Sequence, residues 1–143
     1  MAHLRRSQYD ARLMSDLKVE ELASALPAPE LWGSFKVLEV KGSRLELFGW
    51  VLGKDSEVQR VEVLAGGAVI ASSALGVPRE DIAKEHPGRE SAATCGFRVV
   101  IEAKGKGRSE LELRAVLADE TPVRMGAVHV LAPTRRWDVF RRR

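Results

Sequence analysis

The sequence predicts an all-β fold in which antiparallel strands form a sandwich or a partly open barrel. Segments 96–103 and 109–117 alternate between apolar and polar residues, as strands with one buried and one solvated face do. Turns that contain glycine separate short apolar runs from residue 35 onward. We therefore expect about seven strands between residues 35 and 131, in one domain.

Two hairpins and one bulge are predicted within this region. Lys41-Gly42-Ser43 separates segments 35–40 and 44–52, and Gly66-Gly67 separates 61–64 from 68–71. Glycine tolerates the positive φ angles of such tight turns. The last strand, 123–131, loses its alternation near Gly126, which predicts a β-bulge there.

An amphipathic helix is predicted near the N-terminus. Apolar residues recur at helical spacing from Val19 to Leu26, Ser15 is a suitable N-cap, and Pro27 ends the pattern. The chain then divides into a helical N-terminal arm (1–31), a β-sandwich (32–132) and a basic C-terminal tail (133–143).

A second, shorter helix is predicted within segment 76–88, where a sandwich would cross from one sheet to the other. Pro78 suits its first turn, and Pro87-Gly88 ends it. Asp81 is expected to accept backbone N–H bonds in the first turn and to pair with Arg79, with a ligand contact as the alternative.

The net charge of +3 arises from the ends of the chain. Arg5 and Arg6 contribute two positive charges and segment 135–143 a net four, so residues 7–134 carry −3. A nucleic-acid-binding domain places basic residues on a folded face, so no nucleic-acid partner is expected. We interpret the arginine-rich tail as solvated, with a phosphate or membrane contact as the alternative.

No transmembrane or secretory segment is predicted, because the apolar runs are short and none follows the basic N-terminus. A cytoplasmic location is therefore expected. Cys95 is the single cysteine, which excludes an internal disulfide and a cysteine zinc site, and it is expected to pack as a small hydrophobic residue.

Several short motifs follow one another in a fixed order between residues 44 and 130. They are Phe48-Gly49-Trp50, Val61-Glu62-Val63, Leu75-Gly76-Val77-Pro78-Arg79-Glu80-Asp81-Ile82-Ala83 and Cys95-Gly96-Phe97. Together they resemble an accessory domain that occurs beside bacterial glycosyltransferases and other transferases acting on cell-surface glycans. One departure is that many such domains place an aspartate directly after the Gly-Trp strand, whereas this chain has Gly53-Lys54-Asp55.

The resemblance implies an immunoglobulin-like antiparallel β-sandwich with a non-catalytic role in glycan assembly. Such a module would hold a carbohydrate or dock onto a glycosyltransferase, with weak affinity for sugar and no cofactor. The alternative is a structural adaptor that docks through its helical arm and arginine-rich tail.

The candidate ligand or partner contacts are Arg79 and Asp81, described above, and three aromatic residues, Phe48, Trp50 and Trp137. Strand 44–52 is apolar on both faces, and its second face carries Phe48 and Trp50. Trp50 is expected to pack, through a bulge at Gly49 or beneath the N-terminal helix, and its alternative role is a platform for a sugar ring. Trp32 and Trp137 lie outside the predicted strands and are expected to help cover this face.

No catalytic constellation is predicted, so we expect a protein that is not an enzyme. His3, His86 and His129 do not cluster at metal spacing, so no metal site is expected. Glu110 and Glu112 share the solvated face of their strand and do not form a pair of catalytic acids. A small enzyme with a site built from loops remains the rival interpretation.

Overall fold

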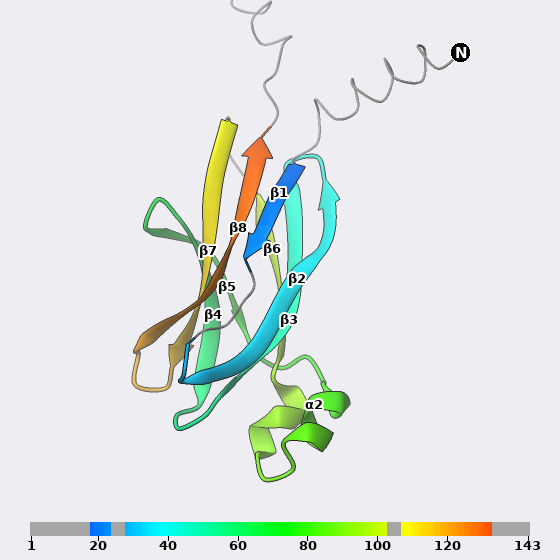
Figure 1. Ribbon diagram of the computed structural model, residues 1–143, viewed down its shortest axis with the longest axis vertical. Coiled ribbons are helices and arrows are strands. Elements are labelled where there is room, and N and C mark those ends of the chain that lie inside the picture. Colours follow the sequence, from blue (N-terminus) through cyan, green and yellow to red (C-terminus); the bar gives the residue numbers. More distant parts are fainter. Residues whose placement is uncertain (1–17, 24–27, 103–106, 133–143) are drawn as a thin grey trace, which may run out of the picture.

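The computed structural model describes residues 18–23, 28–102 and 107–132 of the chain. These residues form strands and two short helices (Figure 1). The strands are β1 (Lys18–Ala23), β2 (Leu31–Lys41), β3 (Arg44–Gly53), β4 (Val58–Ala65), β5 (Ala68–Ala74), β6 (Gly96–Glu102), β7 (Gly107–Leu117) and β8 (Pro122–Ala132). The helices are α2 (Glu80–Glu85) and the 3₁₀ helix η1 (Glu90–Thr94). Neither described helix has the length and apolar character needed to cross a membrane.

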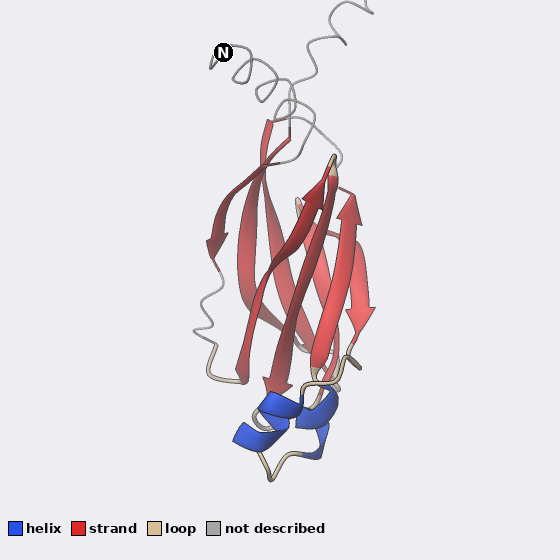
Figure 2. Cartoon of the chain, turned by 90° about the vertical axis from the view of Figure 1, so that its right-hand side faces the viewer, coloured by secondary structure: helices blue, strands red, loops and turns tan. Residues whose placement is uncertain are grey.

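The strands form two antiparallel sheets that pack face to face (Figures 1 and 2). The larger sheet has the order β1-β8-β7-β4-β5, and the smaller sheet has the order β2-β3-β6. Strands β2, β3 and β6 opposite β4, β7 and β8 correspond to the A-B-E and C-F-G strands of immunoglobulin-like sandwiches. The predicted all-β sandwich is confirmed, with β2 to β8 as the seven expected strands.

The core lies between the two sheets and is filled by alternate residues of each strand. The smaller sheet contributes Leu45, Leu47 and Phe97, and the larger sheet contributes Leu113 and Val128, all at most 1% exposed. Burying a side chain of this size stabilises the fold by about 1.5–3 kcal/mol. The alternation seen in the sequence is therefore also the main source of stability.

Both predicted hairpins are confirmed. Gly42 joins β2 to β3 with a φ of +62°, and Gly66 and Gly67 join β4 to β5 with φ of +58° and +84°. These angles strain residues that have a Cβ atom, which explains the glycines. The bulge expected in the last strand is also present, because the pairing of β7 with β8 shifts beside Gly126.

The predicted N-terminal helix is wrong over residues 18–23, which form β1 at the edge of the larger sheet. The pairing of β1 with β8 shifts just after Val19, so Val19 and Leu22 lie opposite Val130 and Val128. A bulged strand thus reproduces the three-residue spacing that resembled a helical turn. The open edge of β8 supplies backbone partners along the whole segment, and these select the strand.

The rest of the predicted arm, 1–17 and 24–27, lies outside the described residues, and so does the tail 133–143. Residues 18–23 cannot be part of a helical arm that docks onto a partner, because their backbone is paired with β8.

The helices α2 and η1 lie together at one end of the sandwich, on the connection from β5 to β6 (Figure 2). The inter-sheet helix is therefore confirmed, although α2 is shorter than the predicted segment. Glu80 and Asp81 occupy its first turn and Lys84 its last. Pro78 precedes the helix instead of lying in its first turn, and η1 was not predicted.

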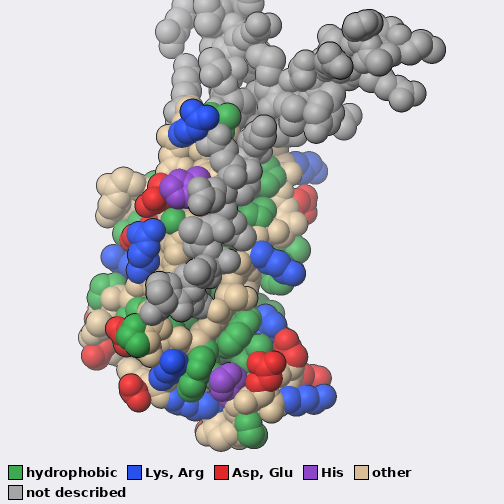
Figure 3. Space-filling model, viewed as in Figure 1, with side chains coloured by type: hydrophobic (Ala, Val, Ile, Leu, Met, Phe, Trp, Pro, Cys, Tyr) green, Lys and Arg blue, Asp and Glu red, His purple; other side chains and the backbone are tan. Residues whose placement is uncertain are grey.

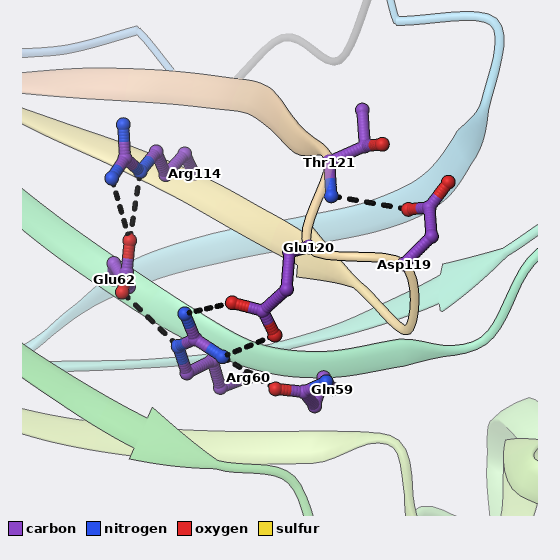
Figure 4. A network of polar contacts seen from close by, with 7 residues as sticks. All are labelled: Gln59, Arg60, Glu62, Arg114, Asp119, Glu120 and Thr121. Carbon is purple, nitrogen blue, oxygen red and sulfur yellow. Dashed lines mark hydrogen bonds and ion pairs between the residues drawn. The ribbon is translucent and has the colours of Figure 1, made fainter.

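The outer face of the larger sheet holds one buried carboxylate, that of Glu62 on β4, which is 8% exposed. Arg60 Nε donates to it at 3.0 Å and Arg114 Nε at 2.8 Å, and Arg60 also bonds Glu120 in the turn before β8 (Figure 4). Burial raises the pKa of Glu62, but the hydrogen bonds from Arg114 and Arg60 outweigh it and hold the pKa below its usual range. This network joins β4, β7 and the turn before β8.

Gly49 allows β3 to lie close against β2. It is paired with Phe35 on one side and Phe97 on the other, in regular register, so the bulge predicted at Gly49 is absent. A Cβ atom at this position would lie 2.2 Å from the backbone oxygen of Ser34 and 2.7 Å from Phe35 Cα. Both are backbone atoms, so a side chain here would force the two strands apart.

Gly49→Ala should therefore destabilise the protein by about 1–3 kcal/mol, the usual cost of overpacking a core. Gly88→Ala is the matched control, because a Cβ atom at Gly88 meets nothing within 4 Å. It should change the free energy of unfolding by less than about 0.5 kcal/mol. Urea unfolding of both variants tests this, and equal stability of the two would contradict the close approach of β2 and β3.

Candidate functional site

The outer face of the smaller sheet carries a row of one aromatic and two basic residues. Strand pairing places Phe48 of β3 between Lys36 of β2 and Arg98 of β6. Lys36 Nζ lies 5.0 Å from the centre of the Phe48 ring, which is within the range of a cation–π contact. Arg98 Nε lies 3.2 Å from a carboxylate oxygen of Glu46, which precedes Phe48 by two residues in β3.

The next row along the sheet carries a tryptophan between two small residues. Trp50 of β3 is paired with Ser34 of β2 and with Gly96 of β6. Neither neighbour has a side chain large enough to cover the indole, which is half-buried.

The segment that leads from β5 to α2 forms a wall beside this row. Val77 and Gly96 exchange backbone hydrogen bonds of 3.0 and 3.1 Å, and Arg79 N donates to Ala93 O at 2.8 Å. A Cβ atom at Gly96 would lie 2.7 Å from Val77 O and 3.1 Å from Arg79 Cγ. Glycine at position 96 is therefore what lets Val77 and Arg79 approach β6.

Together the two rows and the wall enclose an open groove of about 400 Å³. This volume is at the lower end of the range for small-molecule sites, roughly 300–1,000 Å³. Its lining consists of Ser34, Phe35, Lys36, Phe48, Gly49, Trp50, Val77, Arg79, Phe97 and Arg98. The floor is aromatic, and the basic side chains come from three separate elements.

Arg79 is held at the rim of the groove by Asp81. Arg79 Nε lies 3.0 Å from Asp81 Oδ1 and Nη2 lies 2.8 Å from Oδ2, which makes the pair bidentate. The hydrogen bonds from Arg79 lower the pKa of Asp81 to about 2. The predicted pairing is thus confirmed, and it fixes the direction of the guanidinium group.

One side of Trp50 is covered by α2 and η1, which lie at one end of the sandwich. A second apolar cluster, separate from the main core, contains the buried residues Leu52, Ile82, Ala92 and Cys95, with Trp32, Trp50 and Ala83 packed against it. Trp50 thus packs on one side, as expected, and lines the groove on the other. Its cover is the α2–η1 segment, so the expected cover by an N-terminal helix is wrong.

Trp32 lies in β2 and not outside the strands, as the sequence suggested. His86 packs against it with ring centroids 4.5 Å apart, and Trp50 lies 6.3 Å from the same imidazole. Lys54 Nζ and Arg89 Cζ lie 5.1 and 5.6 Å from the Trp32 ring centre. Trp32 is therefore a packing residue that fixes α2 to the sheet.

Three of the five predicted contact residues meet in the groove, namely Phe48, Trp50 and Arg79. Asp81 stands beside it as the partner of Arg79, and Trp137 lies outside the described residues. Lys36, Arg98 and the wall at Val77 were not predicted from the sequence. Cross-strand register brings the two cations beside Phe48, and register is not readable from one strand alone.

Cys95, Glu110 and Glu112 do not line the groove. Cys95 is buried, and burial raises the pKa of its thiol. Glu110 and Glu112 lie on the outer face of β7, as their alternation with apolar residues predicts. Both form ion pairs with Arg124. Among the described residues, no three histidine, cysteine, aspartate or glutamate side chains are grouped as metal ligands.

Comparisons with known proteins show a weak likeness in fold but no family. No protein family model matches this sequence, and no curated protein matches it. Among solved structures, the chain is similar to the fibronectin(III)-like modules of Clostridium thermocellum CbhA, with 16% identity and a TM-score of 0.43 over 68% of this chain and 92% of that chain. The fold assignment depends on the strand order and pairing given above.

Arg79→Gln should raise the pKa of Asp81 from about 2 toward the ordinary value of 3.8, because it removes the bidentate donor. Carboxyl carbon NMR during a pH titration measures this directly. Arg44→Gln is the control, because it removes a cation of β3 that does not line the groove. It should leave the titration of Asp81 unchanged. An unaltered pKa in Arg79→Gln would mean that the pair does not orient Arg79 in solution.

Proposed function

We propose that this chain is a non-catalytic binding module that holds a carbohydrate in the groove between the smaller sheet and the Val77–Arg79 wall. The observation that carries the proposal is an aromatic floor, Phe48 and Trp50, surrounded by hydrogen-bond donors. Its setting would be bacterial surface-glycan assembly beside a glycosyltransferase, and for that setting the support is the sequence resemblance described above.

The chemistry of a sugar ring matches this lining. A pyranose has an apolar face of C–H groups, which stacks on aromatic rings, and an edge of hydroxyl groups, which needs hydrogen-bond partners. The floor of the groove offers the first surface, and Ser34, Lys36 and Arg79 at its margins offer the second.

The open form of the groove favours binding over chemistry. The described lining contains no carboxylate, imidazole or thiol that could act as a general base or nucleophile. The charge of Arg79 is already balanced by its ion pair with Asp81. A shallow site of this kind binds weakly, with an affinity near the millimolar range, or roughly −4 kcal/mol.

The test is a glycan array of bacterial surface saccharides, followed by titration of each retained glycan. Trp50→Ala and Phe48→Ala should each weaken binding about tenfold or more, the factor that about 1.4 kcal/mol of lost contact represents. Val69→Ser is the matched control, because Val69 is an exposed apolar residue of β5, 47% exposed, on the other sheet.

Trp50 also packs against the helical end, so Trp50→Ala must be checked for folding by thermal unfolding. Phe48→Ala serves as the independent variant, since Phe48 is not part of that cluster. Retention of no glycan by the native protein would overturn the proposal, and so would variants Trp50→Ala and Phe48→Ala that both bind as tightly as the native protein.

A further inference from the structure

We infer that the groove selects saccharides that carry a negative charge, such as those built from uronic acids. This inference rests on the proposed carbohydrate binding and narrows its ligand class. Its basis is the lining, which contains three cations, Lys36, Arg79 and Arg98, and no described carboxylate.

This concentration of cations departs from the rest of the body. Residues 7–134 carry a net charge of −3, so basic groups are in the minority outside the two ends of the chain. On the face of the molecule seen in Figure 3, acidic and basic side chains are interspersed. All charged residues of the groove lining are cations, and two of the three pair with carboxylates outside it, so the groove keeps a net positive charge that favours an anion.

The rim cations retain donors for a ligand. The pair with Asp81 uses Nε and Nη2 of Arg79, whereas a guanidinium group has five N–H donors. Asp81 approaches from α2 and does not line the groove, so it aims the guanidinium without filling the site. Arg79 is thus oriented before any ligand arrives, which lowers the entropic cost of binding.

Lys36 and Arg98 stand on opposite sides of Phe48. The Arg98 side chain is 61% exposed and forms an ion pair with Glu46, which does not line the groove. Lys36 has its ammonium over the Phe48 ring, and among the described residues no ion pair involves it. A ring that lies on Phe48 and Trp50 would therefore meet a cation at each edge.

An acidic sugar satisfies both features at once. The C–H face of its ring can contact the aromatic floor while an exocyclic carboxylate at its edge reaches a rim cation. A phosphate group on a sugar offers the same charge at the same place, so the shared chemistry is an anionic group beside a sugar ring. Lysine and arginine bind either group.

The experiment compares three oligosaccharide probes by titration calorimetry or NMR. The probes are an oligogalacturonate, a neutral galactose oligomer of the same length and a phosphorylated maltooligosaccharide. At low ionic strength, at least one acidic probe should bind about fivefold to tenfold more tightly than the neutral one. This preference should fall at high salt, because the rim is exposed to solvent.

Lys36→Gln should remove most of the preference for the acidic probe, because losing the charge weakens binding of the acidic probe more than binding of the neutral one. Lys36→Glu should reverse the preference. Lys41→Gln is the matched control, since it removes a lysine of the same strand that does not line the groove. It should change neither affinity.

The outcomes separate this inference from the function beneath it. Equal affinity for acidic and neutral probes, or a preference unaffected by Lys36→Glu, overturns the charge selection and leaves carbohydrate binding standing. Failure of all three probes and of the glycan array overturns both. Tighter binding of the galacturonate or of the phosphorylated probe supports the inference and identifies which anionic group is preferred.

Discussion

The structure depends on the fact that β3 is apolar on both of its faces. Leu45, Leu47 and Val51 point into the main core, while Phe48, Trp50 and Leu52 lie on the outer side of a sheet that has only three strands. Outer apolar side chains cost free energy in water unless something covers them. The α2–η1 segment covers Leu52 and one side of Trp50, and Lys36 lies over Phe48. The groove is the part of this face that remains open between the two covers.

Two glycines make this partial cover possible. Gly49, the residue before Trp50, lets β2 approach β3 closely. Gly96, which is paired with Trp50, lets the Val77–Arg79 segment pack against β6. The same aromatic residue is thereby supported by packing and bordered by donors. Binding sites work best when their residues are held by the surrounding structure, and here Asp81 and the α2–η1 segment provide that support.

Strands β2 to β8 could be predicted from the sequence, but the order of the strands within each sheet could not. The alternation in β6 and β7 and the glycines at 42, 66 and 67 identified the sandwich, because side-chain period and turn geometry are local properties. The spacing of Val19 and Leu22 misled, since a bulge and the edge of β8 create the same pattern in a strand. Phe48, Trp50 and Arg79 could be nominated one at a time. Lys36 and Arg98 join them only through cross-strand register, which depends on the whole sheet.

The recognition surface that we propose is the outer face of the smaller sheet, around Trp50. The most direct measurement is a residue-by-residue NMR map of the full chain during titration with a saccharide that it retains. The signals of the Trp50 indole, the Phe48 ring and the amides of Val77 and Gly96 should shift together and report one affinity. Shifts confined to the larger sheet around Glu62, with the Trp50 signals unmoved, would contradict this proposal.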